Sequence, residues 1–152
     1  MSYIRVHGYD AGRIMAPASP GDAVSLGEIG TIINNAAAQT IPAAAIVGQV
    51  ILRQGAGVVS DITDTAVNIM QAMYGNTGTE PRVGEGFLVF YSNWGASSVT
   101  LTGGVGVTMT GNTVALTLTT KTILIVCTAS GVKTFANGVY TNVGATFTAQ
   151  VM

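Results

Sequence analysis

The chain has 152 residues, of which 9% are charged and 48% are hydrophobic, and its formal net charge is −1. An ordinary soluble domain carries about 25% charged residues. This chain lacks the clustered Lys and Arg that hold nucleic acid or an anionic membrane, so we expect neither partner. One cysteine and one histidine exclude an internal disulfide and Cys- or His-rich metal sites.

Residues 1–40 are predicted to form an extended N-terminal arm used for attachment and assembly. Pro17, Pro20 and several glycines interrupt any periodic pattern within residues 1–30. The stretch 3–7 alternates weakly and could add as a strand to another sheet. The candidate attachment residues are aromatic or basic: Tyr3, Arg5, His7, Tyr9 and Arg13. We see no apolar leader followed by a cleavage site.

Residues 41–152 are predicted to form one β domain that contains a single short helix at about 64–74. A strand is expected over 46–53, before the helix. Asp61 and Thr63 offer oxygens that could cap the helix, and Asp64 lies in its first turn. Residues at helical spacing form one apolar face: Ala66, Ile69, Met70 and Met73.

From residue 84 onward the sequence predicts strands. Aliphatic residues alternate with threonine, which is typical of half-buried antiparallel strands. Glycine pairs at 103–104 and Gly-Asn at 111–112 predict hairpin turns between them. The expected strands are 86–91, 98–102, 105–110, 114–119, 122–127, 132–135 (paired across residues 130–131) and 143–151, the last closing the sheet. Their spacing favours an antiparallel β-sandwich or jelly-roll-like fold.

Residues that could carry chemistry are few. The glycine-rich stretch 103–107 is followed by a strand and has no lysine nearby, so it predicts a turn rather than a phosphate site. The carboxylate pairs Asp61/Asp64 and Glu80/Glu85 are better explained as a helix cap and a solvated turn than as a glycosidase pair. Cys127 is expected to be a buried, inert thiol. We therefore expect no enzyme, no metal and no cofactor.

Four stretches occur in a characteristic order: "AIVGQVILRQGAG", "SDITDTAVNIMQAM", "VGEGFLVFYSNWGASSVTLTGGVGVTMTGN" and "TLTTKTILIVCTASGVKTF". In this order they resemble a β-sandwich module that recurs in structural proteins of tailed phages and large double-stranded DNA viruses. The resemblance covers about residues 43–151, and "SSVTLTGGVGVTMTGN" is its most specific part. Trp94 departs from the module, where a small or polar residue is usual.

This resemblance implies a virion structural protein made in the host cytoplasm: a capsid decoration, cement or minor capsid component. It implies a homotrimer that contacts the major capsid protein or other virion proteins. The sparse charge agrees with a surface covered in an assembly, although a surface of Thr, Ser, Asn and Gly would also be soluble. The alternative is a fibre or spike head that binds a receptor or glycan through aromatic residues near turns: Tyr91, Trp94 and Tyr140. A tail enzyme is the least favoured hypothesis.

Overall fold

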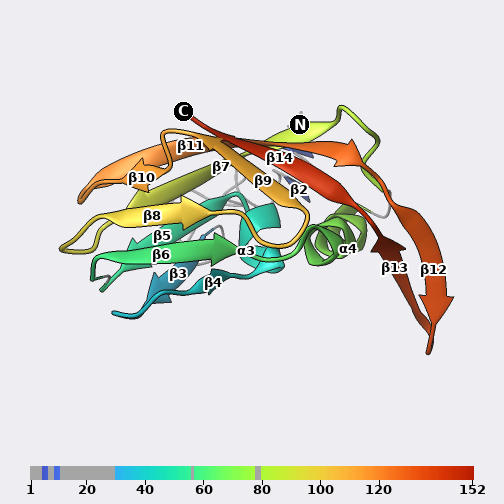
Figure 1. Cartoon of the computed structure of the whole chain (residues 1–152), viewed down its shortest axis with the longest axis horizontal. Coiled ribbons are helices and arrows are strands. Elements are labelled where there is room, and N and C mark those ends of the chain that lie inside the picture. Colours follow the sequence, from blue (N-terminus) through green and yellow to red (C-terminus); the bar gives the residue numbers. More distant parts are fainter. Residues whose placement is uncertain (1–4, 7–8, 11–29, 56, 78–79) are drawn as a thin grey trace, which may run out of the picture.

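Strands dominate the computed structural model of the chain (Figure 1). The structure describes residues 5–6, 9–10, 30–55, 57–77 and 80–152, and gives only the backbone of residues 5–6, 9–10, 76–77 and 140. The strands of a six-stranded sheet are, in spatial order, β3 (Thr31–Asn34), β5 (Val50–Gln54), β7 (Gly86–Asn93), β11 (Thr119–Ala129), β14 (Thr146–Val151) and β9 (Val107–Gly111). Those of a four-stranded sheet are β10 (Val114–Ala115), β8 (Val99–Thr102), β6 (Val59–Thr63) and β4 (Thr40–Ile41).

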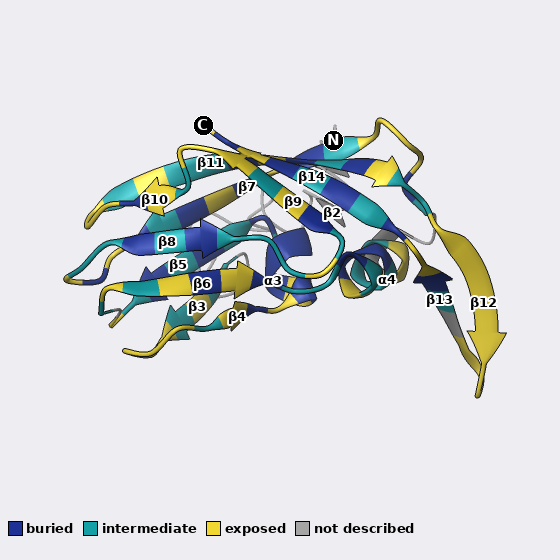
Figure 2. Cartoon of the chain, viewed as in Figure 1, coloured by how far each residue is buried: buried dark blue, intermediate teal, exposed yellow. Residues whose placement is uncertain are grey.

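The two larger sheets share one hydrophobic core. Every second side chain of β7 is buried, beginning at Phe87, and the same alternation places Val99 and Leu101 of β8 in the core. These residues belong to one cluster with apolar side chains of β11 and β14. Figure 2 shows the alternation as bands of buried and exposed colour along the strands. The fold is therefore mainly β, as predicted.

The expected antiparallel arrangement is corrected by the pairings. Five of the eight strand pairings in the two larger sheets are parallel. From β3 to β11 the chain alternates between the sheets, so each strand is followed by one in the other sheet. Neighbours within a sheet are therefore separated by an intervening strand and often run in the same direction.

The predicted hairpins across residues 103–104 and 111–112 are likewise absent from the described part of the chain. β8 pairs with β6 and β10, whereas β9 pairs with β14. Gly104 lies where the chain leaves β8, and a Cβ atom there would collide with the backbone oxygen of Thr63. This glycine thus permits close approach of two backbones rather than a hairpin turn.

The segment 114–119 was predicted to be one strand but is mostly a turn. Only β10 forms, and Thr119 donates its backbone N–H to the carbonyl of Leu116 (3.2 Å). Leu118 has φ 57°, in the left-handed region that a non-glycine residue rarely adopts. Alternation alone could not reveal this turn.

A second helix, α3 (Ala43–Val47), occupies the start of the strand predicted over 46–53. Pro42 is its N-cap, and the Pro42 carbonyl accepts from the backbone N–H of Ala45 (2.9 Å). The alanine-rich sequence has high helix propensity. Gln49 then turns the chain with φ 69°, and β5 begins at Val50.

The predicted helix is confirmed as α4 (Ala66–Thr77). Its buried face contains Ala66, Ile69 and Met70, and Met73 packs against the core. The cap differs from the prediction: the Thr65 hydroxyl accepts from the backbone N–H of Asn68 (3.2 Å). Asp61 and Thr63 are instead buried in β6.

The boundary predicted at residue 40 is also moved. β3 pairs with β5 in the six-stranded sheet, and β4 begins at Thr40 in the four-stranded sheet. Residues 31–40 are therefore part of the β fold rather than of an arm. Of the earlier residues, the structure describes β1 (Arg5–Val6) and β2 (Tyr9–Asp10), which pair with each other antiparallel.

The last two-stranded sheet consists of β12 (Val132–Ala136) and β13 (Val139–Val143). It continues the β11–β14 ribbon beyond an irregularity between Cys127 and Ala129 and extends past α4 at the right of Figure 1. β12 thus pairs with β13, not with residues 122–127 as predicted. β14 lies between β11 and β9 rather than closing the sheet at an edge.

Candidate functional site

A fully buried ion pair joins the two larger sheets. Arg53 of β5 and Asp61 of β6 are joined by Nε–Oδ2 (2.7 Å) and Nη2–Oδ1 (3.2 Å) contacts. Both side chains have 0% exposure. Bidentate geometry of this kind gives charge-assisted hydrogen bonds with a fixed orientation.

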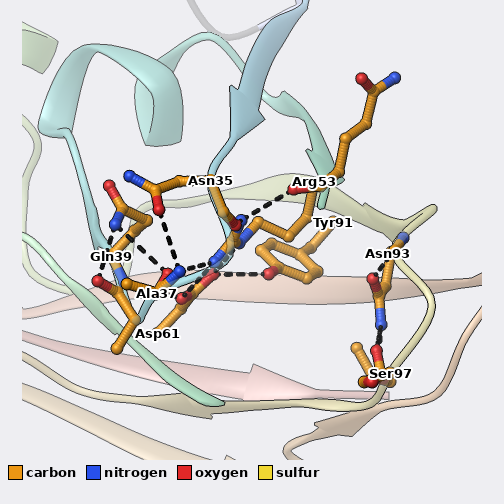
Figure 3. A network of polar contacts seen from close by, with 12 residues as sticks. Asn35, Ala37, Gln39, Arg53, Asp61, Tyr91, Asn93 and Ser97 are labelled. Carbon is orange, nitrogen blue, oxygen red and sulfur yellow. Dashed lines mark hydrogen bonds and ion pairs between the residues drawn. The ribbon is translucent and has the colours of Figure 1, made fainter. Parts of the chain in front are cut away.

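Further hydrogen bonds of this pair hold residues 35–39 against the sheets (Figure 3). Arg53 donates to the carbonyl oxygens of Asn35 and Ala37, the latter at 2.8 Å. Asp61 Oδ1 accepts from the backbone N–H of Gln39 (2.9 Å). A segment that the sequence assigned to the arm is therefore fixed by a buried charge.

Tyr91 of β7 completes the network. Its hydroxyl donates to Asp61 Oδ2 (2.9 Å), and its side chain is fully buried. Burial raises the pKa of Tyr91 well above its usual value, and the Asp61 carboxylate acts in the same direction. Because all three side chains are inaccessible to solvent, the Arg53–Asp61–Tyr91 network is suited to holding strands together rather than to binding a ligand.

The first candidate surface is the side of the six-stranded sheet that faces away from the core, called here the outer sheet face. In register, Ile32 lies beside Leu52, Val50 beside Phe90, and Leu88 beside Leu124. Exposed fractions reach 54% at Ile32 and 43% at Phe90. The apolar members of the outer sheet face are Ile32, Val50, Leu52, Leu88, Phe90, Leu124 and Val126.

Threonine and glutamine continue this face over β14 and β9. The Thr110 hydroxyl donates to Gln150 Oε1 (2.8 Å), and the Thr128 and Thr146 hydroxyls are 2.8 Å apart. None of the outward positions on these six strands carries Lys, Arg, Asp or Glu. A monomer usually intersperses charges on such a surface, so the outer sheet face has the chemistry of an interface.

The second candidate surface is on the β12–β13 hairpin, whose two faces differ. One face is turned to α4: Lys133 Nζ contacts Glu80 Oε1 (2.6 Å) and lies 4.9 Å from the centre of the Tyr74 ring. The hydrogen bond and charge of Lys133 lower the pKa of Glu80. A cavity of about 360 Å³ lies between hairpin and helix, lined by Gln71, Tyr74, Gly75, Glu80, Lys133, Gly138, Val139 and Asn142.

Three exposed apolar side chains gather at one end of the six-stranded sheet. The terminal register pair is Asn93 with Thr119; Trp94 comes directly after Asn93, Leu118 directly before Thr119, and Leu116 is in the adjoining turn. Their exposed fractions are 61%, 77% and 58% respectively. The Trp94 ring N–H donates to the Ser92 hydroxyl (2.8 Å), which fixes the orientation of the indole.

The structure describes the predicted attachment and contact residues to different extents. Tyr3, His7 and Arg13 lie outside the described residues, and Arg5 and Tyr9 are described only as backbone in the β1–β2 pair. The assignment of Tyr91 to surface contact is wrong, because the residue is buried with its hydroxyl bonded to Asp61.

For Trp94 and Tyr140, surface or glycan contact stays a prediction. Trp94 is exposed, as a contact residue must be. Tyr140 is opposite Phe135 in β13, with a side chain outside the description. The three aromatics are therefore not one platform.

The candidate chemical groups are explained by packing. Asp61 is buried in the ion pair, whereas Asp64 Oδ1 accepts from Thr65 N–H (2.7 Å). Glu85 accepts from the backbone N–H of Arg82 (2.8 Å). Cys127 is buried as predicted, and burial raises the pKa of its thiol.

Sequence reasoning missed the outer sheet face, although a signal for it was present. The runs "FLVF" at 87–90 and "ILIV" at 123–126 are apolar at every position, whereas a strand with one solvated face alternates. Because every second residue of these runs faces outward, the outer side is apolar as well.

Comparisons with known proteins found no relative of this chain. No family model, no curated protein and no solved structure matches the chain. Among the residues that the structure describes, neither helix combines the length and apolarity needed to cross a membrane.

Proposed function

We propose that this chain is a structural assembly protein of the capsid-decoration, cement or minor-capsid kind, working as a homotrimer of β-sandwich, jelly-roll-like modules. The supporting observation is the outer sheet face, where Leu88 and Leu124 are register neighbours on a surface without charge. Such a surface gains free energy when covered, at roughly 25 cal/mol per Å² of apolar area. Because the outer sheet face carries no charged side chains, covering it does not require any charge to be desolvated.

The virion placement is supported by the resemblance of residues 43–151 to the phage and viral module. Under this proposal the major capsid protein or another virion protein is the second partner. Attachment to it is assigned to the N-terminal residues Tyr3, Arg5, His7, Tyr9 and Arg13. Strand addition by such a segment would supply backbone hydrogen bonds without requiring charge.

Sedimentation velocity over a range of protein concentrations tests the assembly. The wild-type chain is expected to sediment as a trimer, and Leu124→Lys as a monomer. The new ammonium group would have to be desolvated in the interface, which weakens association by at least about 100-fold. Leu124 is 36% exposed, so a lysine there can reach water in the free monomer and leave the fold intact.

Val58→Lys is the matched control. Val58 is 84% exposed in the loop between β5 and β6, outside the strands that form the outer sheet face. The same charge change there should leave the trimer unchanged. A wild-type chain that stays monomeric at micromolar concentration would contradict the proposal, and its copy number in purified virus particles would test the virion placement.

A second function is favoured by Trp94. Its indole is 61% exposed and is oriented by Ser92, as a ring that stacks on a sugar would be. Binding to a glycan array that is lost in Trp94→Ala and kept in Leu116→Ala would support a receptor-binding head. Glycan binding that is unchanged in Trp94→Ala would count against it.

A further inference from the structure

The side of the β12–β13 hairpin that faces away from α4 is uncharged and largely exposed. Val132 pairs with Val143, and Thr134 pairs with Thr141. Val132 and Val143 are 70% and 57% exposed. We call this side the outer hairpin face; its members are Val132, Thr134, Ala136, Thr141 and Val143.

Polar side chains connect the hairpin to the rest of the molecule. Lys133 contacts Glu80 and Tyr74 on the body of the molecule. Asn142 is buried, and its amide donates to the carbonyl of Ser130 (3.1 Å). Gly131, with φ 73°, lies where the ribbon leaves the sheet, and a Cβ there would be 2.6 Å from the Val143 oxygen. These contacts turn one side of the hairpin toward α4 and leave the outer hairpin face directed away from it.

The single charge on the hairpin is on its other face. Lys133 is directed to Glu80, so the outer hairpin face offers valine, alanine and threonine only. A partner that covers it must itself be free of charge, because a buried unpaired charge costs several kcal/mol. The outer sheet face meets this condition, because its outward positions carry apolar residues, threonine and other uncharged polar residues.

The hairpin extends past α4, away from the strands that form the outer sheet face (Figures 1 and 2). Its outer face can thus reach a sheet face on another molecule. We propose that the outer hairpin face of one copy packs on the outer sheet face of a second copy. This inference rests on the proposed assembly function and specifies how the copies are joined.

Such a contact joins two different surfaces, so it is heterologous. Heterologous contacts generate closed rings when the rotation between copies closes. A trimer then contains three identical hairpin-to-sheet contacts, and every copy both donates a hairpin and accepts one. An outer sheet face that bound its own kind would instead give a two-fold dimer.

Two charge variants separate these arrangements. Leu124→Lys impairs the outer sheet face and keeps the hairpin, whereas Val132→Lys impairs the hairpin and keeps the sheet face. We expect each variant alone to be monomeric, with Val58→Lys still trimeric. Circular dichroism of each variant would confirm that the fold is kept.

The two variants mixed in equal amounts should form a heterodimer and nothing larger. The intact hairpin of the Leu124→Lys copy would occupy the intact sheet face of the Val132→Lys copy. Native mass spectrometry identifies this species by mass. It should require a protein concentration well above that needed by the wild type, because ring closure is lost.

Several outcomes would overturn the inference. A mixture that stays monomeric would show that the two faces do not meet. Assembly of Val132→Lys equal to wild type, with Leu124→Lys monomeric, would show that the sheet face binds itself and would leave the proposed function standing. Suppose that a chain lacking residues 1–29 is monomeric whereas Val132→Lys still assembles. This result would mean that the N-terminal segment, and not the hairpin, covers the outer sheet face of the next copy. If Leu124→Lys and Val132→Lys both assemble like the wild type, the proposed function fails as well.

Discussion

Asp61→Asn should be among the most destabilising single changes in this chain. Asp61 receives hydrogen bonds from Arg53, Tyr91 and the backbone of Gln39, and it has 0% exposure. Asparagine keeps the shape but removes the negative charge, which leaves the Arg53 guanidinium buried without a counter-ion. Breaking a buried ion pair by removing one partner costs about 3–5 kcal/mol.

Tyr91→Phe is expected to lower the free energy of unfolding through the same network, but by less than Asp61→Asn. It removes one hydrogen bond to the Asp61 carboxylate and keeps the ring in the core. Hydrogen bonds to charged groups contribute roughly 1.5–3 kcal/mol, so the cost should be about half that of Asp61→Asn. The double variant should lose less free energy of unfolding than the two single variants together, because the carboxylate that accepts the Tyr91 hydrogen bond is already absent.

Urea unfolding followed by circular dichroism, at one fixed protomer concentration, measures these differences. The concentration must be fixed because association adds to apparent stability. A loss below about 1 kcal/mol for Asp61→Asn would contradict this prediction, since it would mean that water reaches the Arg53 guanidinium. Additive losses in the double variant would refute the coupling of Tyr91 to Asp61.

Three further predictions concern the core, the pH dependence and the N-terminal residues. Ile69→Ala should cost about 2–5 kcal/mol in urea unfolding through the cavity it leaves in α4 packing, whereas half-buried Val67→Ala should cost far less; equal losses would contradict this. The pKa of Tyr91 is raised above its unfolded value of about 10, so its contribution to stability is complete below pH 10. It is lost as the pH rises further, by at most about 1.4 kcal/mol per pH unit, and Tyr91→Phe should flatten the alkaline decline. Removing residues 1–29 should leave the strand content unchanged by circular dichroism, because the larger sheets begin at β3, and it should abolish attachment to virus particles; an unfolded product would contradict the first expectation.

Local patterns predicted the elements whose buried side chains recur at a regular spacing within a short stretch of sequence. The spacing of Ala66, Ile69 and Met70 indicated the buried face of α4, which the structure confirms. Alternation likewise indicated the buried side of β8. In both cases the periodicity of the backbone and the need to bury one face act within a short window of sequence.

Pairing between strands could not be predicted in the same way. A glycine pair such as 103–104 permits a tight turn, but it also permits close approach to Thr63, and the sequence does not distinguish these uses. The same holds for Asp61, whose carboxylate suits a helix cap as well as a buried ion pair. Its actual partner, Arg53, lies on a strand of the other sheet.

Composition and local pattern were enough to predict a mainly β chain with one helix near residue 66 and few charges. The alternation of the chain between two sheets is visible only in the three-dimensional fold; it makes most neighbouring strands of these sheets parallel and brings residues 31–40 into the fold. The fold also selects which apolar residues remain outside the core: Leu88 and Leu124 become neighbours on an exposed face only through the β7–β11 register. Register and sheet order arise from contacts between distant segments, and these are selected by the burial of the whole core rather than by any local stretch of sequence.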